Sequence, residues 1–385
     1  LYGYLGSLRA IKMERPDLKI LVGGCTAQKD GDLVIEKAAW VDVVFGTHNV
    51  HRVVELMDHA DEWGPITEIW EETTSFDEFP SYLPARRQTP HSAWVTIAIG
   101  CDNSCTFCIV PAVRGKEISR RFGDIIGEVK SLAGEGVSEV TLLGQNVNSY
   151  GRDLELNGRS PVFADLLRQV GAVEGIRRIR YTSPHPKDFK EDVAEAMAET
   201  GAVCEQLHLP LQSGSDRILA AMHRGYNAER FLARLEMARR IIPNLSSSTD
   251  IIVGFPGETE KDFQATLDVV ERARFDQAFT FQYSARPGTV AATLPDQLDK
   301  AVVQERFERL VAMQNNISLA SNEAMVGRVE EVLVEGPSKK DPGVTAARTR
   351  GNKLVHSPGE YEPGTYLMME ITKAASHHLL GQVVS

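Results

Sequence analysis

The chain has 385 residues, of which 42% are hydrophobic and 25% are charged, proportions that are ordinary for a folded globular protein. No apolar run is long enough to cross a bilayer, so we expect a cytoplasmic protein without a membrane partner. The formal net charge of −11 argues against a protein that coats nucleic acid indiscriminately, although local basic patches can still bind RNA. Five cysteines, three of them crowded together, do not make a disulfide framework and favour metal binding or thiol chemistry.

The first 60 residues alternate helical and strand-like patterns, which is typical of a parallel α/β sheet. Strands are expected at 19–25 and 41–45, and helices at the start of the chain, at 33–39 and at 50–57. Because the sequence opens on Leu1 inside a helical pattern, we expect this unit to be part of a longer domain that has lost N-terminal residues. Residues 58–90 are acidic and contain several prolines, which indicates a linker, so the first domain is placed at residues 1–80.

A larger α/β region follows, at residues 86–317. Its predicted strands lie near 94–99, 138–143, 176–182, 203–209, 248–254 and 277–283, with room for a helix after each. Six β/α repeats predict a partial or full β/α barrel with its functional groups at the carboxyl ends of the strands. A doubly wound sheet fits the same periodicity. A long helix is predicted at 297–324, with Val302, Val303, Phe307, Leu310 and Met313 on one side.

The last segment, residues 320–385, has a different pattern. Short β-rich runs at 329–334, 353–355 and 366–371 are separated by Gly/Pro turns. This pattern predicts a small β-barrel.

The strongest chemical signal is the loop after the first strand of the large region. It carries Cys101, Cys105 and Cys108 in the spacing C-x3-C-x2-C. Thiolates are soft ligands that suit iron–sulfur clusters and zinc. Three thiolates in one short loop can hold three irons of a cubane cluster and leave the fourth iron open for a cofactor, whereas most ferredoxin-type sites supply four cysteines. The alternative is a zinc site with a remote fourth ligand.

This loop resembles that of the radical S-adenosylmethionine (SAM) superfamily. The wider string 101–111, together with Arg114-Gly115 and Ser119-Arg120, resembles the methylthiotransferases within that superfamily. Further matching strings are found at 142–151, 208–215, 250–259 and 283–289, so the resemblance covers essentially the whole chain. Gln145-Asn146-Val147-Asn148-Ser149-Tyr150 is most similar to the tRNA branch, the MiaB type, and less similar to the branch that modifies a ribosomal protein aspartate.

The resemblance implies a chemistry and a set of partners. A 4Fe-4S cluster on the three cysteines would reduce SAM to methionine and a 5′-deoxyadenosyl radical, which activates C2 of N6-isopentenyladenosine next to the anticodon of tRNA. A second 4Fe-4S cluster would supply sulfur, and a second SAM the methyl group. The implied partners are the tRNA anticodon stem-loop and an electron donor such as flavodoxin or ferredoxin, and a monomer is expected.

Cys25 lies in Gly23-Gly24-Cys25-Thr26-Ala27-Gln28, at the end of a predicted strand. A lone cysteine there is more often a small buried residue, but the family places its third auxiliary-cluster ligand in this string. No cysteine precedes Cys25, so we expect this chain to lack a stable auxiliary cluster and full activity. We expect Cys204, which falls within a predicted strand, to be a core residue.

Several residues are softer candidates for SAM binding. Glycines and a helix start in the string 250–259 favour close approach of a ligand to backbone N–H groups, against the alternative of a simple connection. The resemblance favours SAM there. Arg120 suits a cofactor carboxylate, but also a phosphate or a solvent-exposed position. The SAM candidates are Gly144, Gln145, Gln212, Ser213, Arg120 and Gly254.

Basic residues suggest where RNA binds. The candidates are Arg114 and Lys116 after the cysteine loop, and Lys339, Lys340, Arg348, Arg350 and Lys353 in the last domain, which resembles the tRNA-binding TRAM domain. Arg177, Arg178 and Arg180 form a further basic run. A solvent-exposed face with no partner is the alternative for each run.

Two other functions stay open. The same chemistry could act on a ribosomal protein aspartate or on tRNA carrying threonylcarbamoyl-adenosine. A protein of another class, a non-catalytic RNA-binding protein with structural zinc, would also carry clustered cysteines and a basic barrel.

Overall fold

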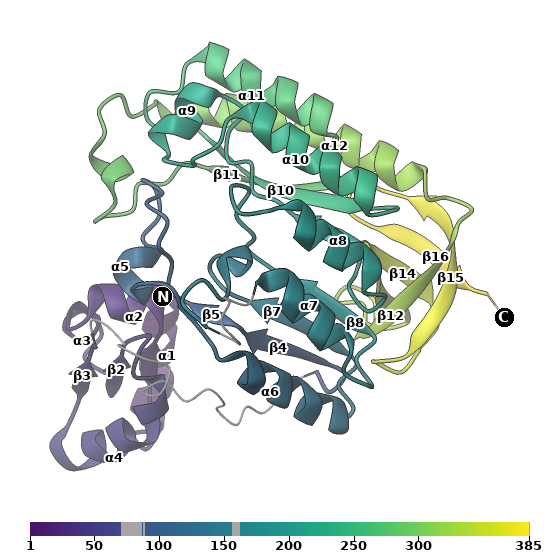
Figure 1. Ribbon diagram of the computed structural model, residues 1–385. Helices are drawn as coiled ribbons and strands as arrows, with labels where there is room; N and C mark the ends of the chain where they lie inside the picture. Colours follow the sequence, from purple (N-terminus) through teal and green to yellow (C-terminus); the bar gives the residue numbers. More distant parts are fainter. Residues whose placement is uncertain (71–86, 88, 156–161, 385) are drawn as a thin grey trace. The chain divides into compact units, whose positions relative to one another are not determined.

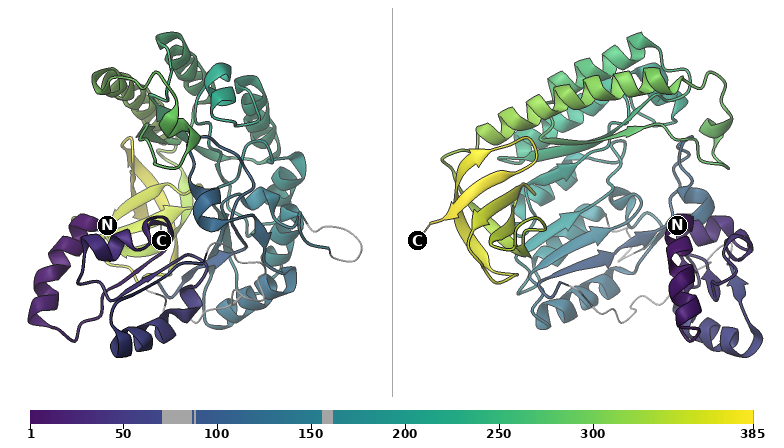
Figure 2. Two further views of the ribbon diagram at one scale, coloured as in Figure 1. Left: turned by 90° about the vertical axis from the view of Figure 1, so that its left-hand side faces the viewer. Right: turned by 180° about the vertical axis from the view of Figure 1, so that it is seen from behind.

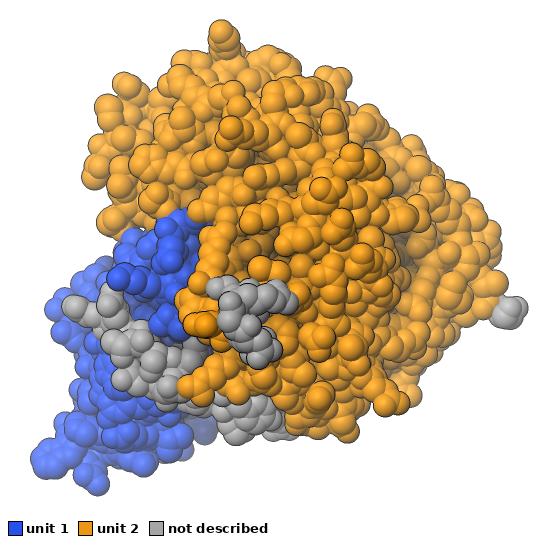
Figure 3. Space-filling view, in the orientation of Figure 1, with its two compact units in different colours: residues 1–86, 99–103, 109–120 blue, residues 87–98, 104–108, 121–385 orange. Residues whose placement is uncertain are grey.

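The computed structural model describes residues 1–70, 87, 89–155 and 162–384. The chain forms two compact units, which are coloured separately in Figure 3. Unit 1 comprises residues 1–86, 99–103 and 109–120, and unit 2 comprises residues 87–98, 104–108 and 121–385. In the described part of the chain, no helix has both the length and the apolar character needed to cross a membrane.

Unit 1 is built on a parallel three-stranded sheet in the order β1-β2-β3. Its strands are β1 (Leu21–Gly23), β2 (Val43–Phe45) and β3 (Ile66–Glu68), and its helices are α1 (Tyr2–Glu14), α2 (Cys25–Asp30), α3 (Leu33–Lys37), η1 (Val50–Arg52), α4 (Val53–Trp63) and α5 (Val110–Arg114). Leu5, Val22 and Val34 pack into its core. The predicted α/β alternation is confirmed. Strand β3, however, lies in the segment that we predicted to be a linker, because its three residues are only partly buried and the sequence around them is acidic and contains prolines. The rest of that linker, residues 71–86, lies outside the described residues.

Unit 2 contains the six predicted strands of the large region, all parallel to their neighbours. They are β4 (Ser92–Thr96), β7 (Glu139–Leu143), β8 (Arg178–Tyr181), β9 (Gln206–His208), β10 (Ser246–Val253) and β11 (Gln277–Gln282). They form two sheets, β4-β7-β8 and β9-β10-β11, joined by a bridge between Ile179 and Val203. The described strands make an open arc, a partial barrel; the full barrel that we also considered is not formed. The short strands β5 (Ala98–Ile99) and β6 (Ile118–Ser119) flank the cysteine loop.

The helices of this region cover the outer, convex face of the arc, as Figures 1 and 2 show. They are α6 (Phe122–Gly134), α7 (Phe163–Gly171), α8 (Glu191–Glu199), α9 (Asp216–Ala221), α10 (Ala228–Ile241) and α11 (Glu260–Ala273), with the single turns η2 (Val147–Ser149) and η3 (Val290–Thr293). Strand alternation fits this arrangement: Ala93 and Val95 are buried under the helices, whereas Trp94 between them is 65% exposed on the inner face. A doubly wound sheet would need helices on both faces.

Helix α12 (Lys300–Glu323) ends this region and confirms the predicted long helix. It buries Val303 and Leu310 as expected. Val302, which we placed on the same side, is 41% exposed, and Arg306 is buried instead. Residues 303, 306 and 310 follow the 3.6-residue period better than a stripe through 302 does.

The C-terminal segment is a closed five-stranded barrel in the order β12-β13-β14-β16-β15. Its strands are β12 (Val329–Pro337), β13 (Val344–Thr349), β14 (Leu354–Pro358), β15 (Tyr366–Ala374) and β16 (Leu379–Val383). Val332, Val355 and Met369 fill its interior. The predicted small β-barrel is confirmed.

Candidate metal centre

The cysteine loop leaves its strand through a glycine that no other residue can replace. Gly100 has φ +76°, and a Cβ there would lie 1.8 Å from the carbonyl oxygen of Lys116. The Cys101 N–H then donates to the carbonyl of Gly115 at 3.1 Å, and the Glu117 N–H donates to Asp102 Oδ1 at 3.0 Å. This tight turn holds the first thiol on a fixed backbone.

The second half of the loop is anchored within unit 2. The Thr106 N–H donates to the carbonyl of Met222 at 3.2 Å, and Thr106 Oγ1 donates to the carbonyl of Ala221 at 2.9 Å. A Cys108 N–H to Cys105 O bond of 3.0 Å closes the turn between the last two cysteines. Thr106 therefore fixes this half of the loop at the end of α9.

The three cysteines form no disulfide among the described residues and are partly exposed, and the sulfurs of two of them accept hydrogen bonds. Asn103 Nδ2 lies 3.4 Å from Cys101 Sγ, and Nη1 of Arg224 lies 3.2 Å from Cys105 Sγ. Arg224 is only 5% exposed, so its charge acts on the sulfur with little screening. This guanidinium is therefore a buried cationic donor in direct contact with the second sulfur of the loop.

The donor set fits an iron–sulfur cluster by its chemistry. Cys101 belongs to unit 1, and Cys105 and Cys108 to unit 2. Among residues 1–70, 87, 89–155 and 162–384, no three His, Cys, Asp or Glu side chains form a ready-made metal-binding group. The fit therefore rests on three partly exposed thiols, their spacing in one short loop and the hydrogen bonds to sulfur, all of which soft thiolate ligation requires.

A pocket of about 320 Å³ lies at the carboxyl ends of the strands, within the size range of ligand sites. Its walls come from the cysteine loop, the segment after β9, and the ends of β10 and β11. The residues that line it are Phe107, Gln212, Asp250, Ile252, Phe281, Gln282, Tyr283, Ser284 and Arg286. Aromatic and aliphatic walls with a few polar groups suit a nucleoside.

Gln212 is the one of our six SAM candidates that lines this pocket. It has φ 68°, a left-handed backbone that is rare outside glycine, and it is 8% exposed. Two backbone bonds hold it against β10, one to Asp250 at 2.8 Å and one from Ile252 at 2.9 Å. Gln212 Oε1 and Tyr283 Oη are buried and have no hydrogen-bond partner among the described residues. A strained residue with an unsatisfied polar atom facing a pocket indicates a ligand contact.

The other five SAM candidates, all within the described part of the chain, do not line this pocket. Ser213 is buried, and its hydroxyl lies 3.3 Å from Thr266 Oγ1, a contact that ties the segment after β9 to helix α11. Arg120 is 3% exposed, which excludes the solvent-exposed position we considered for it. Gly144 and Gln145 follow β7, and Gln145 Oε1 is a further buried atom without a partner among the described residues.

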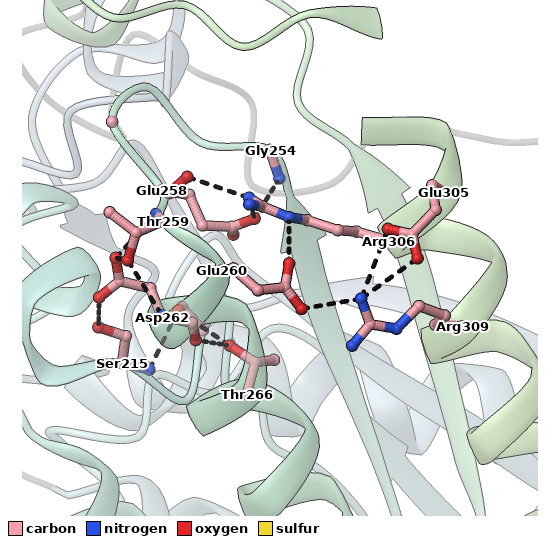
Figure 4. Close-up of polar contacts among 12 residues, drawn as sticks. Ser215, Gly254, Glu258, Thr259, Glu260, Asp262, Thr266, Glu305, Arg306 and Arg309 are labelled. Carbon is pink, nitrogen blue, oxygen red and sulfur yellow. Dashed lines mark hydrogen bonds and ion pairs between the residues drawn. The ribbon is translucent and has the colours of Figure 1, made fainter. Parts of the chain in front are cut away.

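The turn after β10 is occupied by the protein's own side chains, as Figure 4 shows. The Gly254 N–H donates to Glu258 Oε1 at 3.2 Å, and a Cβ at Gly254 would lie 2.5 Å from Val303. The start of α11 is closed by Thr259 and Asp262, each of which accepts from the other's backbone N–H. Two of the N–H groups that we expected to be free at this helix start, those of Thr259 and Asp262, are thus already bound. Gly254 stays a prediction, with close helix packing as its evident structural role.

Comparisons with known proteins show which family the chain belongs to. Residues 95–270 match the model of the Radical SAM superfamily, and residues 323–384 match that of the TRAM domain. The tRNA-2-methylthio-N(6)-dimethylallyladenosine synthase of Mycobacteroides abscessus is 53% identical over 99% of this chain and 77% of its own length. The enzyme of the same name from Streptomyces coelicolor is 54% identical over 99% of this chain and 76% of its own. The chain belongs to this family of methylthiotransferases.

A solved structure shows the same fold at low identity. The radical S-adenosylmethionine methyltransferase TsrM from Kitasatospora setae superposes with a TM-score of 0.57 at 17% identity, over 75% of this chain and 60% of its own. The match to the Radical SAM model and the identity to the methylthiotransferases show that the chain is a radical SAM enzyme. Its cofactors are a 4Fe-4S cluster and SAM.

The remaining two cysteines differ in their surroundings. Cys25 is free and partly exposed at the start of α2, directly after β1 and Gly24, which has φ 92°. Cys204 is 2% exposed, and burial raises the pKa of its thiol. The interpretation of Cys204 as a core residue is confirmed, and an auxiliary-cluster role for Cys25 stays a prediction.

Two arginines of the basic run at 177–180, Arg178 and Arg180, are buried in a joint between the β/α region and the TRAM barrel, both in unit 2, whereas Arg177 is 53% exposed. Arg178 is fully buried and donates to the carbonyls of Arg348 and Glu331 at 2.8 and 2.9 Å. Arg180 donates to the carbonyls of Arg350 and Thr349, both at 2.9 Å. The sequence alone could not separate a solvent-exposed arginine run from one that a distant domain covers.

Two of the predicted RNA contacts are also engaged at this joint. Arg350 pairs with Glu205 at 2.8 Å, and Lys353 pairs with Asp276 at 2.8 Å. Arg348 pairs with Glu335 within the barrel at 2.6 Å. Lys339 and Lys340, in the turn between β12 and β13, are exposed, as is Lys116 after α5, while Arg114 is half-buried. The exposed lysines are the better RNA candidates.

Sequence reasoning did not single out Arg224, Tyr283 or His185. Arg224 reaches Cys105 from a turn 119 residues further along the chain. No local pattern reveals such a contact. His185 lies between two prolines, Pro184 and Pro186, just after a strand, and that combination was the available signal.

Proposed function

We propose that this enzyme transfers a methylthio group to C2 of N6-dimethylallyladenosine next to the anticodon of tRNA. The proposal is carried by identities of 53–54% to relatives named for that product, over 99% of the chain. The thiols of Cys101, Cys105 and Cys108, in a loop whose backbone is held by hydrogen bonds on both sides, supply the ligands that the chemistry needs.

The chain's own residues bind and orient the reactants. When bound, the 4Fe-4S cluster supplies one-electron reduction of SAM. Arg224 orients Cys105 as a cluster ligand through its 3.2 Å contact to sulfur. Gln212 and Tyr283 offer polar contacts to the adenosine of SAM, and the rings of Phe107 and Phe281 bound the same pocket and exclude water from it.

Sulfur insertion needs a second set of thiolate ligands. Cys25 is proposed as one of them, at the carboxyl end of β1 where open α/β sheets bind ligands. A single thiolate does not hold a cubane cluster, so Cys25 alone does not support sulfur insertion. A second SAM is the proposed methyl donor.

The tRNA is proposed to bind through exposed lysines, Lys339 and Lys340 on the TRAM barrel and Lys116 beyond the cysteine loop. A TRAM domain at residues 323–384 supports RNA as the partner. A flavodoxin or ferredoxin as electron donor, a monomeric state and a cytoplasmic site of action are further parts of the proposal, and they rest on the family resemblance.

The test compares anticodon stem-loops that carry dimethylallyladenosine, threonylcarbamoyl-adenosine or unmodified adenosine. Anaerobically reconstituted enzyme is assayed for 5′-deoxyadenosine and for methylthiolated RNA by mass spectrometry. We expect 5′-deoxyadenosine formation that depends on the three cysteines, and we expect any methylthiolated product to form only on dimethylallylated RNA. Product only on another RNA, or on a ribosomal protein aspartate, would contradict the substrate; colourless, iron-free protein that folds with zinc would contradict the chemistry.

A further inference from the structure

Two buried hydrogen-bond donors without partners lie beyond the carboxyl ends of neighbouring strands. Asn148 follows β7, and His185 follows β8, whose residues Leu142 and Tyr181 pair in register. This end of the strands is where β/α barrels place their reactants. None of the functions described so far uses either side chain.

The proton on the His185 ring can be placed from its contacts. The Lys187 N–H donates to His185 Nδ1 at 3.2 Å, so Nδ1 is an acceptor and the proton sits on Nε2. The ring is 6% exposed, and its burial, together with the charge of Arg224, lowers the pKa of His185 to about 2. The ring is therefore a neutral imidazole, and its Nε2–H has no partner among the described residues.

The orientation of the Asn148 amide follows from the same neighbourhood. The backbone N–H of His185 donates to Asn148 Oδ1 at 2.9 Å, which identifies that atom as the oxygen. Asn148 Nδ2 is therefore the second buried donor, and it too has no partner among the described residues. Through this one contact the two donors are fixed to each other.

The surroundings supply positive charge, and a neighbouring carboxylate is already hydrogen-bonded through both oxygens. The nearby carboxylate of Asp188 already accepts from Asn146 Nδ2 at 2.8 Å and from Arg152 at 2.5 Å. Arg224, Lys187, Arg234 and Arg152 all act on His185 electrostatically. Two unsatisfied donors in a field of cations favour an anionic oxygen as their missing partner.

This donor pair is connected to the cysteine loop by a short chain of contacts. The His185 ring packs edge-on against Tyr226, with 5.9 Å between ring centroids. Tyr226 Oη accepts from Arg224 Nε at 3.1 Å, and Arg224 reaches Cys105 Sγ. The donor pair is therefore linked to Cys105 through Tyr226 and Arg224.

We propose that His185 Nε2–H and Asn148 Nδ2–H bind an anionic oxygen of a reactant at this position. The oxygen belongs either to the carboxylate of SAM or to a phosphate of the target nucleotide in RNA. This proposal rests on the proposed function for the identity of the reactants. It assigns the binding of an oxyanion to two residues for which the family resemblance provided no role.

The test measures binding, not turnover, with cluster-loaded enzyme and two titrants, SAM and a dimethylallylated anticodon stem-loop. His185→Phe removes the donor and keeps a ring, whereas His185→Gln keeps an N–H near the same position. Asn148→Asp keeps the oxygen that accepts from His185 and replaces the second donor with a negative charge. Iron content and thermal unfolding establish that each variant is folded and loaded.

We expect His185→Phe and Asn148→Asp to lower the affinity for one of the two titrants by about tenfold to a hundredfold. The affinities of His185→Gln should remain within about threefold of the wild type. A loss of SAM affinity alone assigns the carboxylate. A loss of RNA affinity alone, with the salt dependence reduced by about one counterion, assigns the phosphate. Unchanged affinities for both titrants, or equal losses in His185→Phe and His185→Gln, would overturn the proposal and leave a buried water as the partner. Wild-type enzyme that binds both titrants but forms no 5′-deoxyadenosine would instead contradict the proposed function.

Discussion

Arg306 donates a hydrogen bond of 2.9 Å to the carboxylate of Glu258, and both side chains are almost completely buried. The same carboxylate accepts from the Gly254 N–H, so the last helix of the β/α region is tied directly to the turn that follows β10. Burial raises the pKa of Glu258, against the opposing effect of Arg306. The pair fixes the backbone next to the pocket that Gln212 lines, and it explains why Arg306 replaces an aliphatic residue in the buried stripe of α12.

Breaking this pair should be strongly destabilising. We expect Arg306→Met to lower the free energy of unfolding by about 3–5 kcal/mol, because it leaves the Glu258 carboxylate buried without its partner. Arg309→Met, three residues along the same helix, is the control. Arg309 is 38% exposed and pairs with Glu260, so its loss should cost about 1 kcal/mol or less. Urea unfolding of the two variants checks the difference, and equal effects would contradict a special role for the buried pair.

A second matched pair tests the joint between the β/α region and the TRAM barrel. Arg178→Met should free two barrel carbonyls and the Glu331 carboxylate, and we expect the barrel to become susceptible to limited proteolysis. Arg177→Met is the control, because Arg177 is 53% exposed and stacks on Tyr366 with 3.6 Å between its guanidinium carbon and the ring centroid. Its removal should cost about 1 kcal/mol or less and leave the barrel protected. Equal protection of the barrel in both variants would show that Arg178 does not hold the joint.

The sequence predicted the elements well and their partners poorly. All six strands of the partial barrel and the long helix α12 were predicted, because each lies in an apolar or periodic stretch of sequence. Strand β3 was missed because its residues are only partly buried and lie in an acidic segment that contains prolines. The roles of Arg178 and Arg350 could not be predicted, because their partners lie about 150 residues or more away in sequence. For the site, spacing located the three thiols, while the contacts of Arg224 and His185 appear only when the chain is folded.

Exposed lysines on the TRAM barrel should act on RNA affinity and not on catalysis. We expect Lys339→Ala combined with Lys340→Ala to weaken stem-loop binding and to reduce the salt slope of log Kd by up to about two. Formation of 5′-deoxyadenosine should be unchanged. Lys353→Ala is the comparison, since this lysine pairs with Asp276, and we expect it to lower stability more than RNA affinity. Filter binding at several salt concentrations separates the two effects; an unchanged slope in the double variant would remove these lysines from the RNA surface.

His185 should make stability depend on pH in a predictable direction. In the unfolded chain a histidine takes up a proton below about pH 6.5, whereas the folded pKa of His185 is lowered to about 2, first by burial and then by neighbouring cations. The unfolded state therefore binds more protons, and this group's contribution to stability falls as the pH falls below 6.5. Between pH 7 and pH 5 the loss should be about 2 kcal/mol. His185→Gln lacks this contribution, so its free energy of unfolding should fall less over the same interval. Urea unfolding at each pH measures this, and an equal fall in the wild type and the variant would contradict the assignment.

The final prediction separates iron from zinc at the three cysteines. We expect Cys101→Ser, Cys105→Ser and Cys108→Ser each to abolish the iron–sulfur absorbance and the formation of 5′-deoxyadenosine, because loss of one of three thiolates leaves a cubane underligated. Cys204→Ala is the control, since this cysteine is 2% exposed in the core and far along the chain from the loop. It should keep full iron content and lose only a modest amount of stability. Metal analysis after anaerobic reconstitution, together with product assays, distinguishes the possibilities. Zinc at one equivalent and no iron in the wild-type protein would exclude radical chemistry for this loop.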